Sequence, residues 1–237
     1  MKSKQSHILF TIFLSMGFAT CKKDKDSVPP PPAIAYYKFD GDAKNSISSL
    51  YKGQVVGGIS SAEDSLGYDH ACYYFPGDSH VYIQDADGLD FPGNQFTFSA
   101  WIRPGEAKGT YVVHKETGND DEPYSLDIFP GVVRALVRNT ADKEFIATGH
   151  TPIVKNVWQH IAVTFSGTKL IVYYNGESEG ETTVDGALAS SNGPMNIGAN
   201  QNLLPVASFV GRIDNVGIYD KALSGAQIRN LYRNYNQ

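Results

Sequence analysis

The chain has 237 residues, a net charge of −5 and two cysteines. A chain of this length buries about 70% of its unfolded surface on folding. It therefore needs no disulfide framework, and two cysteines exclude both such a framework and a cysteine-based zinc module. The acidic balance argues against nucleic acid as a partner, because phosphates demand a basic surface. Hydrophobic residues make up 41% and charged residues 19%, which excludes disorder for most of the chain.

The first 20 residues are predicted to be a secretory signal. Lys2 and Lys4 form a basic start, and an apolar run follows at residues 8–19. That run is shorter than the ~20 apolar residues that span a bilayer, and it fits the hydrophobic region of a signal peptide. The residues before Cys21 resemble the lipobox of bacterial lipoproteins, although Phe18 and Thr20 depart from it. The resemblance implies cleavage after residue 20 and lipid attachment at Cys21, with a plain signal peptide as the alternative.

Residues 21–33 are predicted to be a spacer behind the lipidated cysteine. Charged residues are followed by four consecutive prolines, which favour an extended polyproline II conformation. Cleavage removes two lysines and no acidic residue, so the net charge becomes −7. The lipoprotein resemblance implies an outer-membrane location, with the N-terminal lipid as the only membrane contact. Acidic residues after the cysteine resemble the surface-export signal of Bacteroidetes-type lipoproteins, but here lysines lie among them. The sequence therefore does not decide between the cell surface and the periplasmic face.

The rest of the chain, residues 34–237, is predicted to be one all-β domain. Short apolar runs alternate with turn clusters, a pattern typical of a sandwich or barrel. Pro130-Gly131 and Asn175-Gly176 predict two tight hairpins. The predicted strands cover residues 34–39, 71–75, 80–84, 95–103, 110–115, 123–129, 132–138, 143–148, 157–165, 169–174 and 207–219.

One helix is predicted, at the C-terminus. Ser224 and Gln227 have the spacing of a capping box. An apolar stripe with helical spacing follows, formed by Ile228, Leu231, Tyr232 and Tyr235. We expect this helix to pack on the sandwich and to have a structural role.

Segments in a fixed order along the body form a pattern of their own. They are YYKFDGDAKNSISS at 36–49, ACYYFPGDSHVYI at 71–83, FTFSAWIRP at 96–104, YSLDIF at 124–129, WQHIAVTFSGTKLIVYYNG at 158–176, MNIGAN at 195–200 and FVGRIDNVGIYDKALSGAQIRNLY at 209–232. Together they resemble the laminin G-like, concanavalin A-like jelly roll of bacterial surface proteins. The resemblance implies two stacked antiparallel sheets, a two-sheet sandwich with a concave and a convex face. Such a fold does not by itself identify a ligand.

Strand alternation separates an apolar face from a mixed face in three predicted strands. The apolar faces should build the core between the sheets, with Phe96, Phe98, Ala100, Ile102, Tyr124, Leu126, Ile128, Val133, Ala135 and Val137. If these strands belong to the concave sheet, their mixed faces line a groove. Aromatic rings stack on sugars, and Asp and Arg bond to hydroxyl groups. The candidate ligand-binding residues are therefore Trp101, Asp127, Phe129, Arg134 and Arg138.

Catalytic patterns are missing from the sequence. Family-16 glycosidases share the expected architecture and carry E-x-D-x-x-E on a concave strand. When Asp127 is laid on the central Asp, Ser125 and Pro130 occupy the positions of the nucleophile and the acid/base, where neither can act. A second acidic set consists of Glu177, Glu179 and Glu181. A solvated edge strand or loop explains this set better than a catalytic site does. No nucleophile elbow, zinc-protease motif or phosphate loop occurs, so we predict no enzymatic activity.

The remaining cysteine and a strand histidine are assigned structural roles. Cys72 lies in the apolar run ACYYF, and its only possible partner is the cysteine expected to carry lipid. Cys72 should therefore be a small buried side chain. His160 lies within a predicted strand, where a lone histidine is more often packed than a ligand.

Calcium is the one cofactor that the sequence supports. The ion takes about six to eight oxygen ligands, and three acidic clusters compete for it. Asp85, Asp87 and Asp90 superficially resemble an EF-hand loop but lack its glycine and its final glutamate. In the resembling jelly rolls, a structural calcium lies between the first and last strands. The resemblance thus implies that the side-chain ligands are Asp40, Asp42 and Asp214, and that backbone oxygens complete the shell. The alternatives are a turn-forming residue 40 and a buried, hydrogen-bonded residue 214.

The function that this pattern favours is a non-catalytic, membrane-tethered binding module. Its expected ligand is a polysaccharide or another glycan, held at the concave face. The alternative is a structural or adhesive module that binds surface protein partners, and a glycoside hydrolase is the least favoured class. The sequence names neither the glycan nor the oligomeric state.

Overall fold

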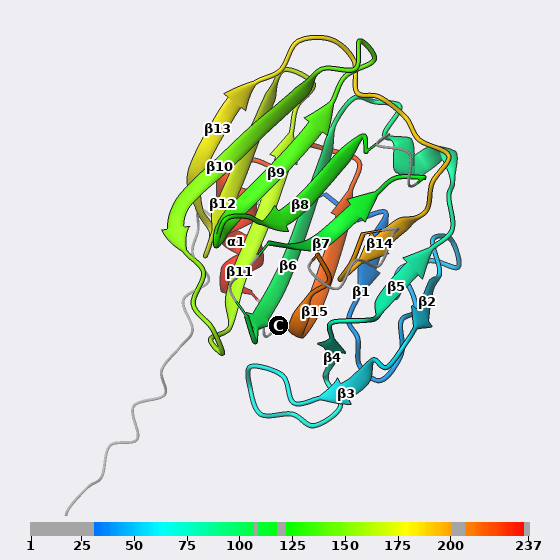
Figure 1. Ribbon diagram of the computed structural model, residues 1–237, viewed down its shortest axis with the longest axis vertical. Helices are drawn as coiled ribbons and strands as arrows, with labels where there is room; N and C mark the ends of the chain where they lie inside the picture. Colours follow the sequence, from blue (N-terminus) through cyan, green and yellow to red (C-terminus); the bar gives the residue numbers. More distant parts are fainter. Residues whose placement is uncertain (1–30, 107–108, 118–121, 201–206, 235–237) are drawn as a thin grey trace, which may run out of the picture.

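The computed structural model describes residues 31–106, 109–117, 122–200 and 207–234 (Figure 1). In chain order the strands are β1 (Ala35–Tyr37), β2 (Gly53–Val56), β3 (Ser60–Ala62), β4 (Cys72–Pro76), β5 (His80–Ile83), β6 (Phe96–Pro104), β7 (Thr110–Lys115), β8 (Tyr124–Ile128), β9 (Val132–Arg138), β10 (Glu144–Pro152), β11 (Gln159–Phe165), β12 (Lys169–Tyr174), β13 (Glu177–Thr183), β14 (Met195–Ile197) and β15 (Val210–Tyr219). A 3-10 helix, η1 (Asp87–Asp90), precedes β6, and the α-helix α1 (Gly225–Arg233) follows β15.

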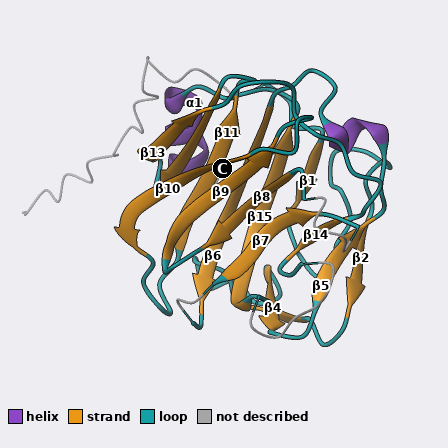
Figure 2. Ribbon diagram, turned by 45° about the horizontal axis from the view of Figure 1, so that its top comes forward, coloured by secondary structure: helices purple, strands orange, loops and turns teal. Residues whose placement is uncertain are grey.

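Two antiparallel sheets form the predicted sandwich, and the two layers can be followed in Figure 2. The eight-stranded sheet has the order β13-β12-β11-β6-β15-β4-β3, and β1 pairs with β15. The seven-stranded sheet has the order β10-β9-β8-β7-β14-β5-β2. Hairpin pairs alternate with pairs of strands that are distant in the chain, such as β6 with β15 and β7 with β14, as expected for a concanavalin A-like jelly roll. The predicted fold class is confirmed.

The predicted strands are all present, with ends that move by a few residues. Both predicted hairpins form. Asn175 and Gly176 have φ values of 48° and 85°, which is the backbone of a type I′ turn. Pro130-Gly131 joins β8 to β9. Four strands are absent from the predicted ranges. Three of them lack apolar alternation or are only three residues long: β2, β3 and β14. The fourth is β13, whose glutamates left an edge strand and a loop both open.

The core lies between the sheets and contains the predicted apolar faces of β6, β8 and β9. An aromatic cluster occupies one region of it, with ring centroids 4.6–5.7 Å apart. Its members are Phe91, Phe96, Phe98, Tyr124 and Phe165. Each fully buried aromatic side chain stabilises the fold by roughly 1.5–3 kcal/mol. Because the core uses the inward faces, the outward faces are free to carry a site.

The predicted helix is confirmed as α1, with the capping box of Ser224 and Gln227 in place. Ile228 is buried against the outer face of the eight-stranded sheet, in a cluster with Tyr173 and Tyr219. Figure 1 shows α1 behind this sheet, on the side away from the seven-stranded sheet. Tyr235 lies outside the described residues.

The predicted signal, most of the spacer and Cys21 also lie outside the described residues, so cleavage and lipidation stay predictions. Within the described ranges, no helix is long and apolar enough to cross a bilayer. Cys72 is buried, and burial raises the pKa of its thiol to about 12. This agrees with the prediction of an inert, packed side chain.

Candidate ligand-binding site

The five predicted ligand-binding residues lie on two different surfaces. Trp101 is on β6, in the eight-stranded sheet, whereas the other four belong to or follow strands of the seven-stranded sheet. The prediction of one groove containing Trp101 is wrong. Alternation assigns a residue to one face of its strand, but it does not assign the strand to a sheet.

Trp101 packs under the C-terminal helix. Its ring stacks on Tyr232 of α1, with centroids 5.5 Å apart and an angle of 20° between the planes. His160 of β11 lies beside it, at a centroid distance of 5.6 Å. Burial lowers the pKa of His160 to about 3, so this imidazole stays neutral at ordinary pH. Trp101 therefore holds α1 on the sheet.

Replacing Trp101 with alanine is expected to destabilise the fold without weakening ligand binding. The ring is half-buried, so we expect a loss of about 2–3 kcal/mol, near the lower end of the range for large aromatic truncations. Urea unfolding measures this loss, and Tyr68→Ala is the control because Tyr68 is exposed. A loss below 0.5 kcal/mol, or a loss of binding in a folded variant, contradicts the packing role.

A pocket of about 500 Å³ opens on the outer face of the seven-stranded sheet. Its size falls within the range of about 300–1,000 Å³ that is usual for small-ligand sites. The lining comes from β7, β8, the turn after β8, β9 and the segment before β15, with Gly109, Thr110, Tyr111, Asp127, Phe129, Arg134 and Ala207. Three of the predicted residues are thus brought together: Asp127, Phe129 and Arg134.

Asp127 and Arg134 form the charged part of this pocket. Arg134 donates two hydrogen bonds to the Asp127 carboxylate, from Nε at 2.7 Å and from Nη2 at 3.0 Å. Ser125 donates a third at 3.0 Å. The Asp127 side chain is only 2% exposed. Burial raises the pKa of Asp127, while the bonds from Arg134 and Ser125 oppose the rise.

Phe129 forms the apolar part of the pocket. Its side chain is 49% exposed, and the guanidinium of Arg134 lies 4.8 Å from its ring centroid. The backbone of Gly109 comes so close that an added Cβ would meet the ring at 2.8 Å. Glycine at this position therefore leaves room for the Phe129 ring. An exposed ring beside a fixed cation is a surface on which a sugar can stack.

Thr110 contributes a polar group that the protein itself does not use. The residue is buried, and its Oγ1 has no hydrogen-bond partner among the described residues. Buried hydroxyl groups are normally satisfied, because an unsatisfied one costs about 1–3 kcal/mol. A ligand or a water molecule in the pocket can supply this partner.

Arg138 lies on the same sheet but outside this pocket. It bonds to Asp142 at 2.7 Å and to Glu144 at 2.5 Å, and it lines a second cavity of about 310 Å³. The side chains of these acidic partners are 84% exposed for Asp142 and 44% exposed for Glu144. The assignment of Arg138 to the same ligand site as Asp127 is therefore wrong.

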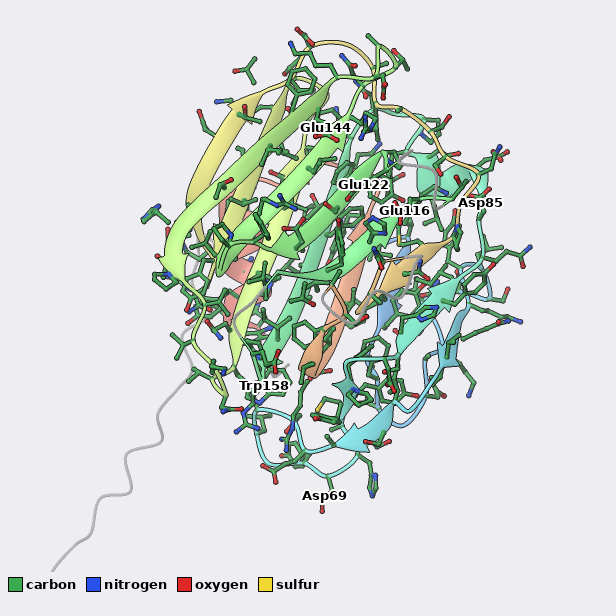
Figure 3. All side chains as sticks on the ribbon, viewed as in Figure 1. Asp69, Asp85, Glu116, Glu122, Glu144 and Trp158 are labelled. Atoms are coloured by element: carbon green, nitrogen blue, oxygen red, sulfur yellow. The ribbon has the colours of Figure 1, made fainter. Side chains whose placement is uncertain are left out.

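Three ionisable side chains beside the pocket escaped the sequence prediction. Nε2 of His114 lies 3.4 Å from an oxygen of Glu122 and 3.8 Å from an oxygen of Glu116. Figure 3 labels both glutamates, Glu116 just after the end of β7 and Glu122 just before the start of β8. Tyr111, a pocket residue, packs against His114, with ring centroids 4.2 Å apart and an angle of 54° between the planes. A bulge in β7 between Tyr111 and Val113 puts Tyr111 and His114 on one face, and simple alternation cannot foresee a bulge.

The predicted calcium ligands do not converge into a cluster of three carboxylates. Asp42 is exposed and is bonded to the ammonium and the backbone of Lys44. Asp214 is buried on β15. Asp40 and Asp214 both act on the same phenol, that of Tyr36. Burial raises the pKa of Tyr36, and the charges of Tyr219, Asp214 and Asp40 raise it further. In the described part of the chain, no group of three His, Cys, Asp or Glu residues is placed to hold a metal ion.

A calcium ion at this place would have to take most of its ligands from backbone oxygens. Calcium between Asp40 and Asp214 stays a prediction, and chelation tests it. A ligand of the native state stabilises that state, so EDTA should lower the melting temperature. An unchanged melting temperature contradicts calcium binding.

The other acidic sets are used within the fold. Asp85 and Asp90 form ion pairs with the buried Lys115. β13 is an edge strand, as one of the two interpretations of its glutamates expected. Each of these glutamates has a partner: Glu177 bonds to Arg229 of α1, Glu179 to His150 and Thr151 of β10, and Glu181 to Lys169.

Comparison with known proteins places this architecture in a family. A family model described as the concanavalin A-like lectin/glucanases superfamily matches residues 75–229. Among curated proteins, the sushi, von Willebrand factor type A, EGF and pentraxin domain-containing protein 1 of Rattus norvegicus is 28% identical over 156 residues. That stretch is 61% of this chain but 4% of the rat protein, so the chain spans only a small part of that relative.

Solved structures share the fold at low identity. Domain 4 of AbnA, an extracellular arabinanase of Geobacillus stearothermophilus solved with arabinotriose, has a TM-score of 0.68 and 21% identity, over 84% of this chain and 98% of that one. The binding domain of Paraclostridial mosquitocidal protein 1 has a TM-score of 0.65 and 18% identity, over 81% and 49%. The binding domain of botulinum neurotoxin serotype G has a TM-score of 0.65 and 14% identity, over 86% and 51%.

Proposed function

Because this chain belongs to the concanavalin A-like lectin/glucanases superfamily, we propose that it is a non-catalytic module that binds a glycan. The proposed site is the pocket of Tyr111, Asp127, Phe129 and Arg134. The observation that carries the proposal is the exposed Phe129 ring beside a guanidinium fixed by a buried carboxylate. The arabinanase domain with the same fold was solved with an oligosaccharide, which makes a glycan the first ligand to test.

The chemistry of the pocket suits a neutral sugar. Arg134 and Asp127 cancel each other's charge, yet the pair keeps edges that can bond to hydroxyl groups. Thr110 adds a buried hydroxyl, and Phe129 adds an apolar ring. The Asp127 carboxylate is held by three hydrogen bonds and is almost fully buried, so it is poorly placed to attack a glycosidic bond. This supports binding over hydrolysis.

Phe129→Ala is expected to weaken glycan binding at least tenfold, which corresponds to about 1.4 kcal/mol of binding free energy. The loss follows from removing the one exposed ring of the pocket. A glycan array that includes arabinotriose selects the ligand, and titration calorimetry measures the affinity. Ile146→Ala is the matched control, since Ile146 is an exposed apolar residue on β10 of the same sheet.

Two results contradict the proposal. The first is that no glycan on the array binds the wild-type protein, which favours a module for protein partners. The second is that Phe129→Ala binds as tightly as Ile146→Ala. Hydrolysis of a polysaccharide panel by the purified protein overturns the non-catalytic assignment separately.

A further inference from the structure

A buried group of ionisable side chains adjoins the pocket. The exposed fractions of the side chains are 1% for His114, 9% for Glu116 and 13% for Glu122. Both glutamates are within 4 Å of the same imidazole nitrogen. Two negative charges beside one imidazole repel each other in such a place, because buried carboxylates need compensating charge or protons.

A chain of contacts connects Glu122 to the charged part of the pocket. Glu122 lies three residues before Ser125, and the Ser125 hydroxyl lowers the pKa of the Glu122 carboxyl, which places the hydroxyl near that carboxyl. Ser125 in turn bonds to Asp127, and Asp127 binds Arg134. All four residues lie on the outer face of β8 and β9 or on the loop that leads into β8. Ser125 is therefore the one side chain between Glu122 and Asp127, which lines the pocket.

The number of protons shared by Glu122, Ser125 and Asp127 determines whether all their hydrogen bonds can form. A serine hydroxyl has a single hydrogen to donate. When both carboxylates are ionised, Ser125 can donate either to Asp127 or to Glu122, and the other carboxylate loses that bond. When Glu122 is protonated, it donates to Ser125, and Ser125 donates to Asp127. Every group in the chain is then satisfied.

We propose that the protonation of Glu122 controls the affinity of the pocket for its ligand. The neutral carboxyl keeps Ser125 bonded to Asp127 and so keeps Arg134 in place under Phe129. The ionised carboxylate withdraws that hydrogen bond and adds a negative charge beside Asp127. This control rests on the proposed function, because it concerns the same pocket.

The surroundings of Glu122 put its titration near neutral pH. Burial raises its pKa to about 7, and the charges of Asp127 and Glu116 also raise the pKa, while Ser125 and Arg134 lower it. Tyr111 and His114 face the same group from β7. Arg138 of β9 bonds to the backbone oxygen of Glu122. Affinity should therefore fall as the pH rises through about 7.

The first arm of the test needs no ligand. The folded protein holds the Glu122 proton up to about pH 7, whereas the unfolded chain releases it near the ordinary value of 4.5. The contribution of Glu122 to stability is therefore largest below pH 4.5 and declines between pH 4.5 and 7. The melting temperature of the full chain, measured from pH 5 to 8.5, should decline less steeply in Glu122→Gln than in the wild type. Glu181→Gln, an exposed change on the other sheet, should follow the wild type.

The second arm measures affinity, with arabinotriose and the array-selected glycan as probes. From pH 5.5 to 8.5, wild-type affinity should fall about tenfold, the effect expected for one hydrogen bond to a charged group. Glu122→Gln should stay near the acidic value, because its amide can donate to Ser125 at every pH. His114→Gln should retain the pH dependence. A pH dependence that survives in Glu122→Gln and disappears in His114→Gln puts the proton on the imidazole and overturns the proposal.

The two arms separate this inference from the proposed function. If the melting curves of wild type and Glu122→Gln have the same slope with pH, Glu122 does not titrate near neutrality and the inference fails. If the slopes differ but no glycan binds, the proposed function fails and the control of this pocket has no ligand to act on, which also overturns it. If glycans bind with a flat pH profile, the inference alone fails.

Discussion

Replacing Arg134 with methionine is expected to lower the free energy of unfolding by about 3–5 kcal/mol, the usual cost of removing one partner of a buried ion pair. The reason is the carboxylate that remains. Asp127 is 2% exposed, and Arg134 supplies two of its three hydrogen bonds. The methionine replaces the aliphatic stem of the arginine, so the loss reports mainly the charge and the hydrogen bonds.

The comparison with Arg138→Met makes this result specific. Arg138 is paired with Asp142 and Glu144, which are both exposed and can be solvated when the arginine is removed. We expect a loss of about 0–1 kcal/mol there. Equal losses in the two variants contradict the view that Arg134 neutralises a buried charge.

The Arg134→Met deficit should also depend on pH. Without the guanidinium, only the hydrogen bond from Ser125 opposes the burial that raises the pKa of Asp127. The folded variant then holds a proton that the unfolded chain releases above about pH 4. Its stability should therefore recover as the pH is lowered from 8 to 5, which urea unfolding at both pH values measures.

The double change Asp85→Asn/Asp90→Asn is expected to destabilise the fold by a similar amount, about 3–5 kcal/mol. Lys115 points into the protein at the end of β7 and has no exposed surface. Its ammonium is paired with the carboxylates of Asp85 and Asp90 and donates to the backbone oxygen of Gly193 at 2.9 Å. Neutral amides leave this charge buried with no counter-charge from those two positions.

Lys115→Met is the informative partner of that experiment. It removes the buried cation, and it leaves two aspartates that are 24% and 33% exposed and can be hydrated. We expect a smaller loss than in the double variant. The order of the two variants in urea unfolding is the test, and a larger loss in Lys115→Met would show that packing of the stem outweighs the charge.

Local patterns predicted the fold because period-two alternation and turn residues determine most of it. The inward faces of β6, β8 and β9, the turn at Asn175-Gly176 and the cap at Ser224 depend on neighbours within a few residues. The seven segments in fixed order supplied the sheet architecture. Strands such as β2 carry little alternation, and their pairing depends on partners that are distant in the sequence.

The candidate site was harder to predict, because it depends on pairing between sheets and on irregular backbone. Trp101 and Asp127 have the same outward pattern, yet β6 and β8 belong to different sheets. The bulge in β7 brings Tyr111 and His114 to one face, and only the tertiary structure brings Glu122 close to His114. The sequence pattern groups Asp85 and Asp90 as possible calcium ligands, whereas the cation that they bind is Lys115, 25 or more positions along the chain.

Glycan binding at the pocket on the seven-stranded sheet can be observed residue by residue. The most direct measurement is a titration of the isotope-labelled protein with the array-selected glycan, followed by NMR chemical shifts of the backbone amides. We predict shifts that cluster at Gly109, Tyr111, Phe129 and Arg134 and are absent from α1 and from β11 beneath it. Saturable shifts that cluster on the α1 surface, or at Arg138 and Asp142 alone, would contradict binding at this pocket.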